Sequence, residues 1–194
     1  MRIILSILLL SVCYSTTINV PADSTTIQAG INGAEEGDTV LVAAGTYYEN
    51  IVWVATNGIK LIGSGEETCF IDGNQEASVI RFEEDLGGII DSTTLITGFT
   101  IQNGVAGMGG GMFLNASSPI LTDVTFSGNT ANNDGGMILF GSSPTLTDVT
   151  FSENTTVSQG GGMYLYSSSP TLNSVTFSDN AAGSGGGMTL QFSS

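Results

Sequence analysis

The sequence predicts an all-β fold, a parallel β-helix solenoid with about six stacked coils of roughly 25 residues each. The first observation is a repeat: "VTFSGN" begins at Val124, "VTFSEN" at Val149 and "VTFSDN" at Val175. Repeats at such a period are typical of solenoids. The second observation is that apolar residues alternate with a period of two, as Met137 and Leu139 do, which is strand behaviour. The intervening segments are rich in Gly, Ser and Pro, which argues against the helical return of a leucine-rich repeat.

Stacked coils place equivalent residues in columns about 4.8 Å apart. We expect the Met and Phe columns to fill the interior, and the Asn column to bond its amides to the backbone and to the next coil. These structural ladders are Met112, Met137, Met163 and Met188, then Phe126, Phe151 and Phe177, then Asn129, Asn154 and Asn180. Each coil is predicted to contain three short strands, Met-x-Leu, Leu-x-x-Val and Val-x-Phe, with turns at Gly-Gly, Ser-Ser-Pro and Asn.

The chain divides into a leader and one domain. Residues 1–15 are predicted to be a signal peptide, because a basic start and the apolar run "IILSILLLSV" precede a small-residue cleavage site after Ser15. Lipidation of Cys13 is the alternative, and both place the protein outside the cell or on its surface. Residues 16–194 form the β-helix domain, with a cap and irregular coils over 16–94 and regular repeats over 95–194.

Both ends of the coil stack carry an expectation. The stretch "DSTTIQAGINGAEEGDTV" predicts a short helix, capped by Ser24 or Thr25, that covers the N-terminal end. Ile27, Ile31 and Ala34 share one face of it. The last repeat stops without a capping segment, so we expect either further coils in a longer protein or contact with a partner or a second copy.

Charge and cysteine content exclude several classes of function. The chain has 18 acidic and 3 basic residues, no histidine and a net charge of −15, which repels nucleic acids and anionic membranes. We therefore expect no nucleic-acid partner, and no run outside the leader is long enough to cross a membrane. Cys69 stands alone in the mature chain and is predicted to be a buried core residue.

Two stretches resemble a known family. "TIQAGINGAEEGDTVLVAAGTYYENI" resembles the opening of secreted right-handed parallel β-helix proteins of the pectin-lyase-like superfamily. The segments "FSGN…GGM", "FSEN…GGGM" and "FSDN…GGGM" resemble the repeats of chlamydial polymorphic outer membrane proteins and related bacterial surface proteins. The resemblance implies a right-handed β-helix. It does not decide function, because the superfamily spans lyases, hydrolases, esterases, adhesins and inert stalks.

The residues do not match the catalytic sets that the superfamily implies. A pectate-lyase-like elimination resembles a reaction that needs an acidic calcium cluster and a base, yet the mature chain holds only Lys60 and Arg81, the latter followed by Glu83, Glu84 and Asp85. Polygalacturonase-like and methylesterase-like sets are absent. We therefore predict a non-catalytic scaffold for adhesion or glycan contact. The alternatives are a polysaccharide lyase or hydrolase, and a structural, self-associating stalk.

Three groups of residues are candidates for binding. Asp123 and Asp148 are candidate metal ligands, with Asp134 nearby, and calcium is the metal that such oxygens favour; no other cofactor is expected. Outward hydroxyl side chains form a grid that could contact sugars or ice: Thr125, Thr150, Thr176, Ser127, Ser152 and Ser178. The aromatic residues that could stack on sugar rings are Tyr47, Tyr48, Trp53, Tyr164 and Tyr166.

Overall fold

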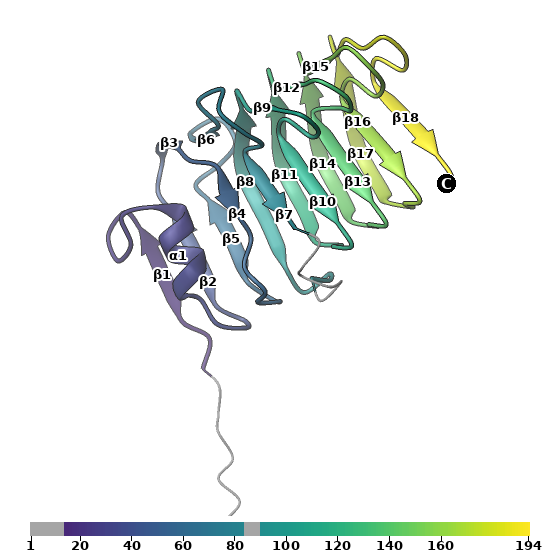
Figure 1. Ribbon diagram of the computed structural model, residues 1–194. Helices are drawn as coiled ribbons and strands as arrows, with labels where there is room; N and C mark the ends of the chain where they lie inside the picture. The colour runs from purple at the N-terminus through teal and green to yellow at the C-terminus, as the bar shows by residue number, and fades with distance from the viewer. Residues whose placement is uncertain (1–13, 84–89) are drawn as a thin grey trace, which may run out of the picture.

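The computed structural model describes residues 14–83 and 90–194, and it confirms the predicted all-β parallel β-helix (Figure 1). Apart from Tyr14 and Ser15, the predicted signal peptide, with Cys13, lies outside the described residues, as do Glu84 and Asp85. No helix in the described ranges is long and apolar enough to cross a membrane.

Three parallel sheets form the walls of the solenoid. Sheet A contains β1 (Thr17–Val20), β2 (Thr39–Val42), β3 (Gly45–Tyr48), β5 (Lys60–Gly63), β6 (Cys69–Asp72), β8 (Leu95–Gln102), β11 (Ile120–Ser127), β14 (Thr145–Ser152) and β17 (Thr171–Ser178). Sheet B contains β4 (Ile51–Val52), β7 (Ile80–Phe82), β10 (Met112–Asn115), β13 (Met137–Phe140), β16 (Met163–Tyr166) and β18 (Met188–Gln191). Sheet C contains β9 (Val105–Ala106), β12 (Thr130–Ala131) and β15 (Thr155–Thr156).

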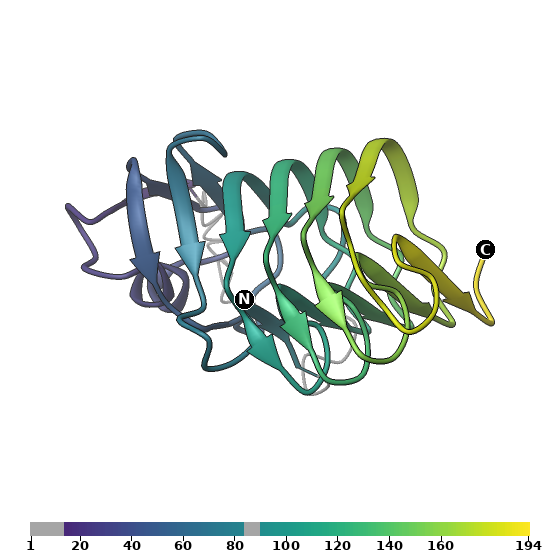
Figure 2. The ribbon, with the colours of Figure 1, turned by 90° about the horizontal axis from the view of Figure 1, so that it is seen from above.

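Each regular coil runs through sheet A, then sheet C, then sheet B, and returns to sheet A one level higher (Figure 2). Six coils extend from β2 to β18, of which three have a described strand in sheet C, and β1 adds one more level to sheet A. Methionines of sheet B pair in register, Met112 with Met137, Met137 with Met163 and Met163 with Met188. The early coils are less regular, since Lys60 of β5 pairs with Leu95 of β8 across a longer segment.

The predicted division into three strands is wrong in one respect. Leu-x-x-Val and Val-x-Phe belong to one eight-residue strand, as in β11, and the remaining strand of the coil follows the Asn. The long strand bends at Asp123, where φ is +51°, and at the equivalent Asp148 and Ser174. A residue in the left-handed region breaks the alternation of side chains and lets Val124 and Phe126 face inward together with Leu121.

The interior is filled by the stacked columns. Phe126 and Phe151 are fully buried with ring centroids 4.8 Å apart, and Phe177 continues the stack at 5.1 Å from Phe151. Met112, Met137 and Met163 are likewise fully buried, whereas Met188 and Phe177 of the last coil are partly exposed. Cys69 is a buried free thiol, as predicted, and burial raises its pKa.

Helix α1 (Ile27–Gly33) covers the N-terminal end of the stack, next to β1 and β2 (Figure 1). Its N-cap is Thr26, not Ser24 or Thr25, and the Thr26 hydroxyl accepts a hydrogen bond from Ala29 N. The Glu49 carboxylate, which follows β3, accepts from the N–H groups of Ile27 and Gln28 at 2.8 and 2.9 Å. A carboxylate from a distant segment therefore completes the cap, which local sequence signals do not reveal.

Candidate functional site

The Asn ladder is a structural device rather than a binding site. Asn129 and Asn154 are fully buried, and each donates from Nδ2 to Oδ1 of the next Asn in the column, at 3.0 and 2.9 Å. The second Nδ2 hydrogen goes to a backbone carbonyl of the preceding coil, that of Ile101 or Phe126. In the coil where Gly104 replaces Asn, the Gly104 N–H donates to Asn129 Oδ1 at 2.9 Å. The turn polar groups are thus satisfied by the fold itself.

A second ladder, of serines, was missed by the sequence analysis. The Ser142 hydroxyl accepts from Ser117 N at 3.1 Å and donates to the Phe140 carbonyl at 2.9 Å. Ser168 repeats the pattern one coil later, and Ser117, Ser142 and Ser168 are all buried. The signal was present in "ASSP", "GSSP" and "SSSP", but the sequence alone suggested only a turn there.

The outer face of sheet A carries rows of hydroxyl groups in register. Thr100 pairs with Thr125, Thr125 with Thr150 and Thr150 with Thr176. Ser127, Ser152 and Ser178 form the adjacent row, and Thr97, Thr122 and Thr147 a third. Most of these side chains are half-buried, so the hydroxyls lie on a regular, accessible surface. The predicted rows therefore lie in register, whereas Thr100, one coil earlier, is buried.

A groove of about 580 Å³ opens at the N-terminal end of this hydroxyl face. Its wall is the β5–β6 loop, residues 64–68, which folds back over the outer face of sheet A. Thr100 Oγ1 donates to the Glu66 carbonyl at 2.7 Å, and Thr125 Oγ1 donates to Glu66 Oε2 at 2.9 Å. These two bonds fix the loop and hold the Glu66 carboxylate at the groove.

Two glycines allow this loop to start so close to the sheet. A Cβ on Gly63 would lie 2.2 Å from the Gly98 carbonyl oxygen, and one on Gly98 would lie 2.7 Å from that of Gly63. Gly98 also occupies the bend position of sheet A, with φ of +76°. Asp123 holds that position one coil later and lines the groove. Side chains at both glycine positions would push the loop away from the sheet.

The candidate metal ligands Asp123 and Asp148 occupy equivalent positions on adjacent coils. Asp123 and Asp148 are both exposed bend residues on neighbouring strands, β11 and β14. Across residues 14–83 and 90–194, no group of three or more Asp, Glu, Cys or His side chains is arranged to hold an ion. Asp134 lies in the β12–β13 loop, and partial burial raises the pKa of its carboxyl.

The two basic residues within the described part of the chain, Lys60 and Arg81, lie on different sheets. Arg81 of β7 belongs to sheet B, where its Nε lies 2.7 Å from Glu83 Oε1 and its guanidinium lies 5.0 Å from the centre of the Phe113 ring. Lys60 of β5 is exposed at the start of a sheet A strand, two residues before Ile62, which lines the groove. Neither residue lines the groove.

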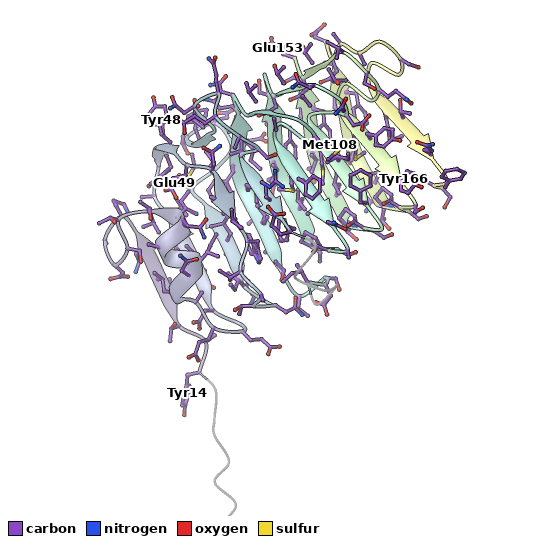
Figure 3. The ribbon with its side chains drawn as sticks, in the orientation of Figure 1. Tyr14, Tyr48, Glu49, Met108, Glu153 and Tyr166 are labelled. Atoms are coloured by element: carbon purple, nitrogen blue, oxygen red, sulfur yellow. The ribbon has the colours of Figure 1, made fainter. Side chains whose placement is uncertain are left out.

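The predicted sugar-stacking aromatics divide into buried and exposed residues. Trp53 is buried and stacks on Phe82 with centroids 4.8 Å apart, and Tyr164 is buried on sheet B. Tyr47 is half-buried, with its hydroxyl donating to the Ala43 carbonyl. Tyr48 is 69% exposed and Tyr166 is 39% exposed (Figure 3). Since these two lie on different sheets, they do not form one aromatic platform.

Residues 46–194 match the family model described as the right handed beta helix region. The chain belongs to this right-handed β-helix family. The match covers every regular coil and all of the groove residues, and it leaves β1, α1 and β2 outside. A search of curated proteins found no match.

Proposed function

We propose that this protein is a secreted or cell-surface scaffold that contacts a glycan through the outer face of sheet A, without catalysing a reaction. The observation that carries this proposal is the continuous hydroxyl surface of β8, β11, β14 and β17, which ends in the groove beside the β5–β6 loop. The extracellular location rests on the apolar leader and on the resemblance of the repeats to those of bacterial surface proteins.

The surface suits a polymer of sugars better than a compact ligand. Rows of Thr and Ser recur at one strand spacing, about 4.8 Å, along the helix axis. Each hydroxyl both donates and accepts, so it can bond to sugar hydroxyls in many orientations. Each hydrogen bond between a sugar and an exposed hydroxyl contributes only about 0.5–1.5 kcal/mol to the binding free energy. Useful affinity therefore requires many such hydrogen bonds at the same time, and the stacked repeats of a solenoid supply them.

A polysaccharide lyase or hydrolase remains the competing proposal, because Lys60 of β5 and the groove carboxylate of Asp123 in β11 both belong to sheet A. Two features favour binding alone. Arg81 of sheet B forms an ion pair with Glu83 and a cation–π contact with Phe113. The chain also has no histidine that could act as an acid or base. A self-associating stalk is the third possibility.

Affinity electrophoresis of the full chain tests the proposal. Gels containing neutral, acidic or amino polysaccharides, with and without calcium, should show retardation in at least one polymer. Thr150→Val removes one hydroxyl from the middle of the face and keeps its shape, and it should reduce retardation. Thr189→Val, on sheet B, is the matched control and should not. Equal retardation of both variants would place binding elsewhere. Unsaturated or new reducing ends after incubation would replace this proposal with the enzyme.

A further inference from the structure

A second groove adjoins the first on the same outer face. It has a volume of about 420 Å³ and an apolar lining that includes Val20, Pro21, Leu41 and Ala43. Ser64 lines both grooves, so they meet at the start of the β5–β6 loop. Leu41 is 41% exposed, which leaves an apolar side chain open to solvent on a sheet whose regular coils present hydroxyls.

The two grooves follow one column of outward residues. Asn19 pairs with Leu41, Leu41 with Ile62 and Ile62 with Thr97, and each of these residues lines one groove or the other. The column crosses β1, β2, β5 and β8 along the helix axis, and Asp123 of β11 lies at its far end. We call this combined depression the trough. Its span of four strand spacings is about 19 Å, which suits an extended ligand.

The character of the trough changes along its length. The β1–β2 end is apolar, whereas the β5–β11 end is lined by Glu66, Glu67 and Asp123. None of the described residues that line either groove is basic. The three carboxylates belong to no arrangement that could hold a metal ion within the described chain. Carboxylates that line a groove without forming an ion-binding group match separate positive charges on one organic ligand better than a single small cation.

We propose that the trough binds a polysaccharide whose sugars carry free, protonated amino groups. This inference rests on the proposed glycan contact and adds the chemical class of the sugar. Ammonium groups donate to the carboxylates of Glu66, Glu67 and Asp123 in charge-assisted hydrogen bonds. The C–H faces of the sugar rings pack on Leu41 and its apolar neighbours, while the ring hydroxyls meet Thr97 and the hydroxyl rows beyond. The net charge of −15 adds long-range attraction for such a polymer.

The test uses isothermal titration of the full chain at pH 6 in about 0.1 M salt with two probes. One is an oligomer of β-1,4-linked glucosamine, and the other is the same oligomer fully N-acetylated, which has lost its charge. The glucosamine oligomer is expected to bind more tightly, and Asp123→Asn and Glu67→Gln are each expected to weaken it about three- to fivefold. The Glu66 side chain is left intact because it also anchors the loop through Thr125.

Matched variants separate the trough from general attraction between opposite charges. Asp148→Asn removes the same charge from the same bend position one coil later, outside the groove, and should have little effect. Leu41→Thr should weaken both oligomers, whereas Val52→Thr, a comparably exposed apolar residue on sheet B, should weaken neither. Circular dichroism checks that each variant is folded.

Each outcome has one meaning. Stronger binding of the charged oligomer, lost in Asp123→Asn and kept in Asp148→Asn, supports the trough. Equal losses of affinity in Asp123→Asn and Asp148→Asn overturn the trough in favour of general attraction between the acidic protein and the charged oligomer. Equal or tighter binding of the acetylated oligomer overturns the amino-sugar inference and leaves the proposed glycan contact standing. Binding of neither oligomer overturns this inference, and retardation by other polysaccharides then decides the proposed function separately.

Discussion

The Asn ladder gives the sharpest stability prediction, for the variant Asn154→Ala. The Asn154 Oδ1 accepts from Asn129 N at 3.1 Å and from Asn129 Nδ2 at 3.0 Å. Asn129 and the Asn154 side chain that is removed are both fully buried, so water cannot replace the lost acceptor without opening the coil. Two unsatisfied buried donors cost about 1–3 kcal/mol each, and we expect a loss of about 2–6 kcal/mol in the free energy of unfolding.

The assay is urea denaturation followed by circular dichroism, together with hydrogen exchange of the Asn129 amide. Exchange is needed because a solenoid can open locally without unfolding as a whole. Asn180→Ala is the control: it frees two donors of Asn154, but the side chain that is removed is partly exposed, so its removal opens those donors to water and the loss should stay near 1 kcal/mol. A loss below about 1 kcal/mol for Asn154→Ala, or one equal to that of Asn180→Ala, would refute the reasoning.

Three further predictions follow from the same contacts. Gly63→Ala places a Cβ 2.2 Å from the Gly98 carbonyl oxygen, so thermal denaturation should show a lower Tm, whereas Gly107→Ala, with open space around it, should leave Tm nearly unchanged. The Cys69 thiol is buried with a raised pKa, so a thiol-specific reagent should label it only after denaturation; rapid labelling of the folded chain would contradict its burial. Burial raises the pKa of Asp134, which means that the folded state disfavours its charge. Asp134→Asn should therefore stabilise the protein at pH 7, and this gain should disappear once the pH falls below the pKa of the unfolded state, near 3.8. Urea denaturation midpoints measured at both pH values check this.

One part of the candidate site, the hydroxyl rows, could be predicted from the sequence, whereas the groove could not. The hydroxyl rows of Thr125 and Ser127 were predictable, because their spacing fixes their column and their neighbours fix their face. The groove was not, since it depends on the β5–β6 loop lying back over β8 and β11. That placement rests on the Thr125–Glu66 hydrogen bond, which joins residues 59 positions apart.

The sequence by itself determined the solenoid, its period and its interior ladders. The columns of Met137, Phe151 and Asn154 recur every 25 or 26 residues, and stacking follows directly because each coil can bury its apolar face only against an equivalent one. Only the tertiary structure decided where strands bend, how the helix is capped and where a ligand could lie. The Glu49 cap of α1 and the Gly63–Gly98 contact each depend on residues brought together by the coils, and no local pattern encodes a contact between distant segments.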